Sequence, residues 1–239
     1  MPGGSFSDSL LVARLRSCWR LKALLAAALC TFFCVPYFLV GNFPILPVHE
    51  LALSPIDRAI GFHPAVWVWI YQSEYLLVNF VPWLAEERAE LMRYARGFAI
   101  LSVVSFAVFV IYPIRAPKPQ VADAGGMYWL LQLYDVPLNS FPSLHAALVI
   151  YTVRFAHRIG LAGRKTMGLL LWTWAVLILY GTLATKEHYF IDIVAGVLLA
   201  VAADAWVWRS QAAVSASFAA SAALPKSFSS SESTAGVRR

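Results

Sequence analysis

The stretch TMGLLLWTWAVLILYGTLAT, residues 166–185, contains no charged side chain over its whole length. A bilayer core about 30 Å thick is crossed by roughly 20 apolar residues in an α-helix. Because lipid offers no hydrogen-bond partners to the backbone, a helix is the conformation expected here. The same reasoning applies to five further stretches, which cover 23–41, 59–84, 97–114, 141–153 and 189–208. The sequence therefore predicts an all-α integral membrane bundle of six helices.

The composition of the whole chain agrees with this prediction. Of the 239 residues, 60% are apolar and only 13% are charged, whereas an ordinary soluble domain has roughly 25% charged residues. This balance excludes a disordered chain and argues against a water-soluble globule. The length fits a single domain.

The formal charge of +6 is explained by the position of the basic residues, since cytoplasmic loops of membrane proteins carry an excess of Lys and Arg. One set of predicted loops and ends holds 15 of the 19 basic residues. We therefore expect both termini in the cytoplasm, with 1–22 as a cytoplasmic N-terminal segment, 23–208 as the membrane domain and 209–239 as a disordered cytoplasmic tail. Because the charge follows the topology, no nucleic-acid partner is expected.

The four basic residues on the opposite face are Arg58, Arg115, Lys118 and Lys186. Arg115 and Lys118 follow the third apolar stretch, and Lys186 lies two residues before His188, where the sixth stretch begins. Snorkelling at the membrane interface explains a single such residue. For the whole set that explanation is weak, so these residues predict a site on the non-cytoplasmic face.

The segment NSFPSLH, residues 139–145, leads into the fourth stretch on the same face. Either of its first two residues can cap the helix, and Pro142 suits the first helical position. Ser143 and the free N–H groups after it then form an anion site at the helix N-terminus. His145 is expected beside any anion that binds there.

The segment TKEHYFID, residues 185–192, opens the sixth stretch. His188 and Asp192 are four residues apart, so they share one helical face and can form a hydrogen bond. A carboxylate on one imidazole nitrogen fixes the tautomer and leaves the other nitrogen as a nucleophile. An acidic side chain within a membrane span is also costly without a partner. The pair therefore indicates a catalytic nucleophile and its orienting group, with a purely structural His–Asp pair as the alternative.

Together these segments resemble the type 2 phosphatidic acid phosphatase superfamily. That family has a Pro-Ser-x-His motif and a His-x-x-x-Asp motif, which match 142–145 and 188–192, and Lys118 stands where it usually has an Arg before Pro. Two departures, Leu144 in place of Gly and Thr182 in place of Arg, look more like its phosphotransferase branch, such as inositol phosphorylceramide synthase. The resemblance also implies the six-helix layout.

The resemblance implies phosphoryl transfer in two steps without a metal or cofactor. His188, oriented by Asp192, would attack phosphorus and form a phosphohistidine. His145 would protonate the leaving oxygen and then activate water or an acceptor hydroxyl. The phosphate oxygens would be held by four residues: Lys118, Arg115, Ser143 and Lys186. The implied substrate is a lipid-linked phosphate, and the enzyme is a phosphatase or a phospholipid head-group transferase of the phosphoinositol type.

Two alternatives from other classes remain. A membrane transporter could also place His, Asp and Lys inside a bundle. His145, His188 and Asp192 also suit zinc in number, although the neighbouring cations disfavour a bound cation. Asn42, Asn79 and Asn139 all lack the Ser or Thr of a glycosylation acceptor. This favours a bacterial inner membrane with the site facing the periplasm; the lipid and the number of subunits are left open by the sequence.

Overall fold

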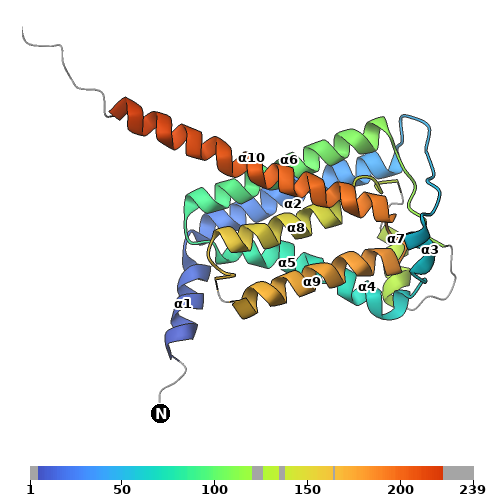
Figure 1. Cartoon of the computed structure of the whole chain (residues 1–239), viewed down its shortest axis with the longest axis horizontal. Coiled ribbons are helices and arrows are strands. Elements are labelled where there is room, and N and C mark those ends of the chain that lie inside the picture. Colours follow the sequence, from blue (N-terminus) through green and yellow to red (C-terminus); the bar gives the residue numbers. More distant parts are fainter. Residues whose placement is uncertain (1–4, 120–125, 135–137, 164, 223–239) are drawn as a thin grey trace, which may run out of the picture.

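The computed structural model describes residues 5–119, 126–134, 138–163 and 165–222. Every regular element within them is helical, and the only β-type pairings there are two isolated bridges (Figure 1). The elements in chain order are α1 (Ser5–Arg16), α2 (Trp19–Asn42), α3 (Pro55–Ala59), α4 (Pro64–Gln72), α5 (Glu74–Phe80), the 3-10 helix η1 (Val81–Leu84), α6 (Arg88–Ile111), α7 (Gly126–Tyr134), α8 (Leu144–Arg158), α9 (Lys165–Ala184) and α10 (Phe190–Ala222). The all-α prediction is confirmed for this part of the chain.

Four helices of the described chain are long and apolar enough to cross a membrane: α2, α6, α9 and the Phe190–Arg209 part of α10. They correspond to four of the six predicted stretches. The second predicted stretch is divided among α4, α5 and η1, and the fourth corresponds to α8, which has only 15 residues. The helices are consistent with a membrane protein, and the count of six crossings stays a prediction.

The second stretch is interrupted at Ser73, which lies between α4 and α5. The Ser73 hydroxyl donates to the Ile70 carbonyl oxygen (2.6 Å) and accepts from Trp174 Nε1 (2.7 Å). A serine that bonds to the preceding turn offers the backbone an alternative to the regular helix. The interruption separates two short helices, of which α4 packs on α9 and α5 packs on α8.

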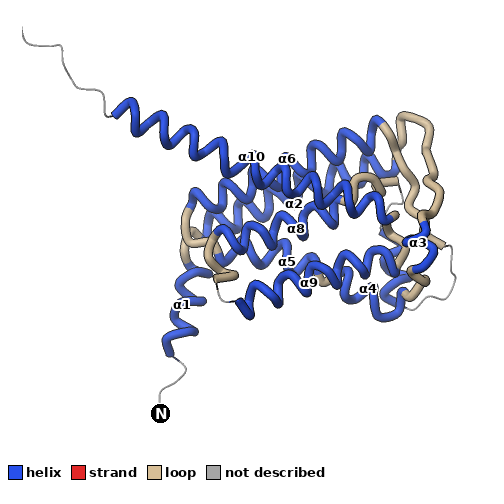
Figure 2. Tube along the Cα trace, in the orientation of Figure 1, coloured by secondary structure: helices blue, strands red, loops and turns tan. Residues whose placement is uncertain are grey.

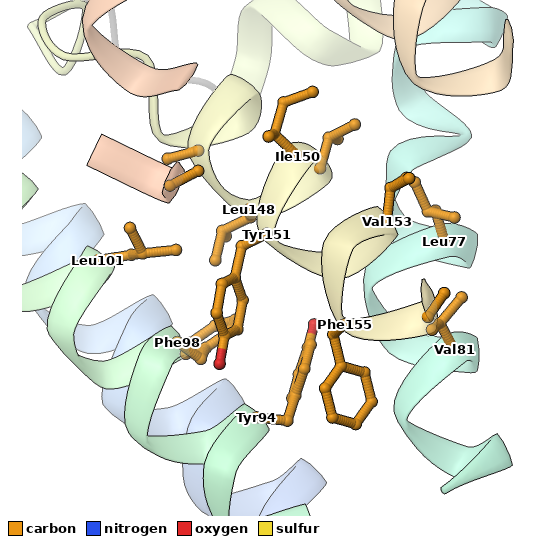
Figure 3. Close-up of a cluster of buried hydrophobic side chains, with 14 of the residues drawn as sticks. Leu77, Val81, Tyr94, Phe98, Leu101, Leu148, Ile150, Tyr151, Val153 and Phe155 are labelled. Carbon is orange, nitrogen blue, oxygen red and sulfur yellow. The ribbon is translucent and has the colours of Figure 1, made fainter. Parts of the chain in front are cut away.

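The core of the bundle is centred on α8, which packs against α5, α6, α9 and α10. Figure 3 shows Tyr151 and Phe155 of α8 beside Tyr94 and Phe98 of α6. A Cβ atom at Gly97 would lie 2.1 Å from the Tyr151 ring, so glycine is needed for α6 to approach α8. Small residues allow this close approach in membrane bundles generally.

The two ends of the bundle carry different helices, although loops lie at both. Helix α1 and the far end of α10 lie at one end, and α3 and α7 lie at the other (Figures 1 and 2). Helix α1 falls within the predicted N-terminal segment 1–22. Helix α10 continues to Ala222, past the predicted end of the membrane domain at residue 208, while 223–239 lie outside the described residues.

At the end with α3, a buried carboxylate joins α3 to the start of α10. Asp57 forms a capping box with Ser54, and its Oδ1 atom accepts from the Phe190 backbone N–H (2.7 Å). Burial alone would raise the pKa of Asp57. The hydrogen bonds from Ser54 and Phe190, together with the nearby Lys186 ammonium, outweigh burial and hold the pKa of Asp57 below its usual value.

Asp57→Asn should lower the free energy of unfolding by about 1–2 kcal/mol at neutral pH, because a charged acceptor is lost. A depressed pKa contributes stability that is present above the unfolded pKa of about 3.9 and is lost as the pH falls through the folded pKa. The difference in Tm between wild type and variant, measured in detergent, should therefore shrink below about pH 4. A pH-independent difference would contradict the charge contribution.

Helix α10 also approaches the start of α8 at Gly196. A Cβ atom at this position would lie 2.2 Å from the Ser143 backbone oxygen and 3.0 Å from the Ala146 Cβ atom. A backbone oxygen cannot swing aside as a flexible side chain can. The lack of a side chain at Gly196 therefore sets the separation of the two helices next to both histidine motifs.

Gly196→Ala should destabilise the protein by about 1–3 kcal/mol through overpacking, and it should reduce activity because Ser143 is displaced. Thermal unfolding in detergent measures the first effect. Gly126→Ala is the control, since a Cβ atom there meets nothing within 4 Å. Wild-type stability in Gly196→Ala would refute the close approach of α10 to α8.

Candidate active site

His188 lies just before α10 and is buried. Its Nδ1 atom is 2.9 Å from the Ser140 carbonyl oxygen and 3.4 Å from Asp192 Oδ2. A carbonyl oxygen can only accept, so Nδ1 carries the hydrogen and Nε2 is the acceptor nitrogen of a neutral ring. The tautomer of His188 is therefore set first by the backbone of the 139–145 segment, a partner that the sequence did not predict.

Asp192 is fully buried and has more partners than the predicted one. Its Oδ2 atom accepts from the Ser140 hydroxyl (2.5 Å) and from the Tyr189 backbone N–H (2.9 Å), and it lies 3.4 Å from His188 Nδ1. The bond from Tyr189 satisfies a free N–H group at the start of α10. Asp192 thus meets His188 as predicted, and it also holds the 139–145 segment against α10.

The start of α8 differs from the prediction. Ser143 is the N-cap, its hydroxyl accepts from the Ala146 N–H (3.2 Å), and the helix begins at Leu144. The prediction of a cap at residue 139 or 140 with Pro142 as the first helical residue is wrong. Those polar side chains are engaged elsewhere, since Asn139 donates to the Tyr37 carbonyl oxygen (3.3 Å) and the Ser140 hydroxyl bonds Asp192.

Ser143, a predicted phosphate ligand, also connects the two histidine motifs. Its backbone N–H donates to the Asp192 carbonyl oxygen (3.0 Å), and its side chain is fully buried. This N–H is therefore occupied. The anion site predicted at the α8 N-terminus would therefore have to use neither this N–H nor those of Ala146 and Ala147, which are bonded to the hydroxyl and the carbonyl oxygen of Ser143.

His145 lies in the first turn of α8, with its ring centroid 5.4 Å from that of His188. Its Nδ1 atom forms an ion pair with Glu74 Oε1, and its Nε2 atom lies 2.9 Å from the Tyr71 hydroxyl. Tyr71 and Glu74 are both buried and lie on either side of the interruption at Ser73. The interruption thus places two partners on one histidine.

Sequence reasoning missed Tyr71 and assigned no partner to Glu74. A signal for Glu74 did exist, because an acidic residue inside an apolar stretch requires a partner. For Tyr71 there was none, since a tyrosine in a membrane span is ordinary. The structure supplies His145 as the partner of both.

Lys118 pairs with Glu187 Oε2, and both side chains are buried, at 8% and 2% exposure. Glu187 directly precedes His188 in the sequence, so the ion pair brings the lysine to the second motif. An isolated bridge between Ile114 and Asn139 also lays the basic segment beside the first motif. Lys118 is therefore a cation whose charge is already matched by a carboxylate.

The other two predicted phosphate-binding cations contact different groups. Lys186 Nζ donates to the carbonyl oxygens of Asp57 and Ile60 (both 2.6 Å), and burial lowers the pKa of this lysine. Arg115 is half exposed, and its Nε atom lies 3.3 Å from Glu50 Oε1. In this structure Lys186 thus closes the C-terminal end of α3, and Arg115 pairs with a surface carboxylate.

The described residues contain no group of three or more His, Cys, Asp or Glu side chains placed to hold a metal ion. His145 is bonded to Glu74 and Tyr71, and His188 Nδ1 faces a carbonyl oxygen. The arrangement is that of two imidazoles, each oriented by hydrogen bonds, at a separation suited to proton transfer and nucleophilic attack on one substrate.

An apolar cavity of about 220 Å³ lies on the His145 side of this pair. Helices α2, α5, α6 and α8 supply its walls, and His145, Glu74 and Asn139 are among its few polar residues. His188 does not line the cavity. Of the two histidines, His145 alone borders this apolar cavity.

Comparison with protein families matches residues 58–206 to the PAP2 superfamily. Comparisons with curated proteins and with solved structures find no match. The matched range contains both histidines, Asp192 and Glu74, and it covers more than half of the chain. The family match, together with two histidine motifs that meet in one buried site, shows that the chain belongs to the PAP2 superfamily and is a phosphatase-type enzyme.

Proposed function

We propose that this protein is a membrane enzyme that takes a phosphoryl group from a lipid-linked phosphate through a phosphohistidine on His188. The observation that carries the proposal is the bond from His188 Nδ1 to the Ser140 carbonyl oxygen (2.9 Å), which makes Nε2 the nucleophilic nitrogen. The His145 ring, with its centroid 5.4 Å away, is close enough to serve the same substrate.

In the first step, Nε2 of His188 attacks phosphorus and the bond to the lipid oxygen breaks. The leaving oxygen takes a proton from His145. The Glu74 carboxylate on Nδ1 of His145 stabilises the charged imidazolium that acts as this acid. To reach the leaving oxygen, His145 exchanges its Nε2 bond with the Tyr71 hydroxyl for one with the substrate.

In the second step, water or an alcohol attacks the phosphohistidine, and His145 takes up the proton. The bond between Nε2 and phosphorus breaks, and its electron pair returns to His188. Attack by water gives a phosphatase, and attack by an alcohol gives a transferase. The same residues serve both outcomes.

A second candidate function is transfer of a phosphodiester head group, and the charge balance of the site supports it. The Lys118 charge is matched by Glu187, Lys186 is bonded to two carbonyl oxygens, and Arg115 pairs with Glu50. A phosphodiester carries about one negative charge, whereas a phosphomonoester carries up to about two near neutral pH. A site with few uncompensated cations suits the phosphodiester better.

For the membrane we propose six crossings, with α4, α5 and η1 together forming the second and α8 the fourth. Both termini would lie in the cytoplasm and the site would face the periplasm of a bacterial inner membrane. The location of α1 and the far end of α10 opposite α3 supports this orientation (Figure 1). So does the excess of basic residues in the loops and chain ends predicted to be cytoplasmic.

His188→Ala should lower turnover of lipid phosphates by at least about 10³-fold, since the nucleophile is lost. Free phosphate and newly formed lipid are measured with a panel of lipid phosphates, with and without inositol or glycerol as acceptor. Wild type should also trap an acid-labile, alkali-stable phosphate label that His188→Ala lacks. His157→Ala, an exposed histidine at the other end of α8, is the control. Substantial turnover or label in His188→Ala would contradict the assignment.

Glu74→Gln should slow the enzyme by about 10–100-fold on alkyl lipid phosphates, because the amide does not stabilise the imidazolium acid. An activated aryl ester needs little protonation of its leaving group, so its turnover should fall much less. Glu86→Gln changes an exposed carboxylate at the other end of the bundle and should behave as wild type. Equal losses on alkyl and aryl substrates would argue against a positioning role for Glu74.

A further inference from the structure

We infer that Glu187 determines which class of phosphate the site accepts, because it neutralises Lys118 and so favours a phosphodiester over the dianion of a phosphomonoester. The inference rests on the proposed function and assigns its choice of substrate class to one side chain. Of the basic residues predicted to bind phosphate, Lys118 is the one that an ion pair joins to the second histidine motif.

Glu187 is held in place by the turn that ends α9. Its backbone N–H donates to the Thr182 carbonyl oxygen (2.9 Å), and the Lys186 N–H donates to the Leu183 carbonyl oxygen (3.2 Å). These two bonds together form the Schellman motif that commonly ends a helix. The motif fixes the backbone of Glu187 directly before His188, so the carboxylate leaves the chain at a defined point next to the nucleophile.

The left-handed residue of this turn is Lys186, with a φ of 59°. Glycine is the usual residue at this position of the motif, since a Cβ atom is unfavourable there. Lys186 has a compensating gain, because its ammonium group donates to the carbonyl oxygens of Asp57 and Ile60 (both 2.6 Å). The turn is thus tied to α3, at the end of the bundle where α10 begins (Figure 1).

The ion pair between Glu187 and Lys118 is buried, with the two side chains 2% and 8% exposed. Removing one partner of a buried pair leaves an uncompensated charge, so the two side chains stabilise each other in the absence of substrate. Together they contribute a net charge near zero. An ammonium group at this place without its carboxylate would contribute a full positive charge.

Two neighbouring groups, Thr182 and Asp192, add no positive charge. The Thr182 side chain is neutral and fully buried, and its hydroxyl donates to the Leu179 carbonyl oxygen (2.8 Å). Asp192 Oδ2 lies 3.4 Å from His188 Nδ1. Carboxylates thus stand both directly before His188 in the chain and beside its ring, and each repels a phosphate in proportion to the charge that the phosphate carries.

The two classes of substrate differ in this charge. A phosphodiester carries about one negative charge, whereas a phosphomonoester carries up to about two near neutral pH. The electrostatic energy that Glu187 adds is therefore about twice as unfavourable for the monoester dianion as for the diester. Removing the charge of Glu187 should improve the monoester more than the diester.

The test compares phosphatidic acid, a monoester, with phosphatidylglycerol, a diester, both with the same acyl chains. In each case a bond forms from His188 Nε2 to phosphorus, the bond from phosphorus to the diacylglycerol oxygen breaks, and that oxygen takes the proton of His145. The leaving group is the same, so diacylglycerol release is measured for both. The readout is the ratio of kcat/KM for the monoester to kcat/KM for the diester, in detergent micelles at about pH 8, where the monoester is a dianion.

The ratio should follow the net charge of the pair. Glu187→Gln leaves Lys118 unmatched and should raise the ratio by at least about tenfold, and Lys118→Gln should lower it by a similar factor. The double variant has a net charge near zero again, so its ratio should lie within about threefold of wild type whatever its absolute turnover. Glu86→Gln is the matched control, since it removes a carboxylate from an ion pair with Arg14 (2.7 Å) at the other end of the bundle.

A second measurement does not require turnover. A phosphate dianion that binds beside the unmatched Lys118 should stabilise Glu187→Gln, because a ligand of the folded state raises the apparent stability. Inorganic phosphate should therefore raise the Tm of this variant more than that of wild type or Glu86→Gln, and dimethyl phosphate, a monoanion, should have a smaller effect. If Glu187→Gln does not fold, the comparison of Lys118→Gln with the double variant replaces it, since loss of Glu187 should raise the ratio in that background too.

The outcomes separate the inference from the proposed function. If wild type turns over no lipid phosphate, the proposed function fails, and the effect of inorganic phosphate on Tm still decides the role of Glu187. If wild type is active but both single variants lower turnover of the two lipids equally, or phosphate raises every Tm equally, Glu187 is a structural partner of Lys118 alone and the inference fails. A ratio that rises in Glu187→Gln, falls in Lys118→Gln and returns in the double variant supports the inference.

Discussion

The carboxylate of Asp192 is the contact on which the catalytic end of the bundle depends. The carboxylate receives hydrogen bonds from the Ser140 hydroxyl and the Tyr189 backbone N–H, and it lies beside His188. The backbone carbonyl oxygen of Asp192 accepts from the Ser143 backbone N–H. These bonds join the start of α8 to the start of α10. Because the carboxylate is fully buried, losing any partner would leave a charge poorly compensated in an apolar surrounding. Gly196, one turn further along α10, permits the same approach from the packing side.

The same constraint explains the other charged groups inside the bundle. Glu74 is paired with His145, and Lys118 is paired with Glu187. At the other end of the bundle Asp204 accepts from both Arg154 and Arg158. Pairing is what allows ionised side chains to remain in a low-dielectric interior. A site whose cations are already paired with carboxylates offers less positive charge to a phosphate dianion. This charge balance is the basis of the proposed phosphodiester substrate.

The interruption of the second apolar stretch connects the fold to the chemistry. In a regular helix through Ser73, the directions of the Tyr71 and Glu74 side chains would be fixed by the helical repeat. The interruption places Tyr71 at the end of α4 and Glu74 at the start of α5, on either side of the His145 ring. It also leaves α5 beside the apolar cavity, so the residue that holds His145 is also part of the cavity wall.

The sequence by itself determined the features that depend on local pattern. Long apolar stretches predicted helices, the four-residue spacing predicted that His188 meets Asp192, and two short motifs indicated the superfamily. Only the tertiary structure decided which distant groups meet. The Ser140 carbonyl oxygen bonds His188 Nδ1, and α8 begins at Leu144 because the earlier polar side chains are bonded elsewhere. Apolar helices of similar composition can pack in many ways, so the partners of Glu74, Lys118 and Lys186 follow from helix packing and not from spacing along the chain.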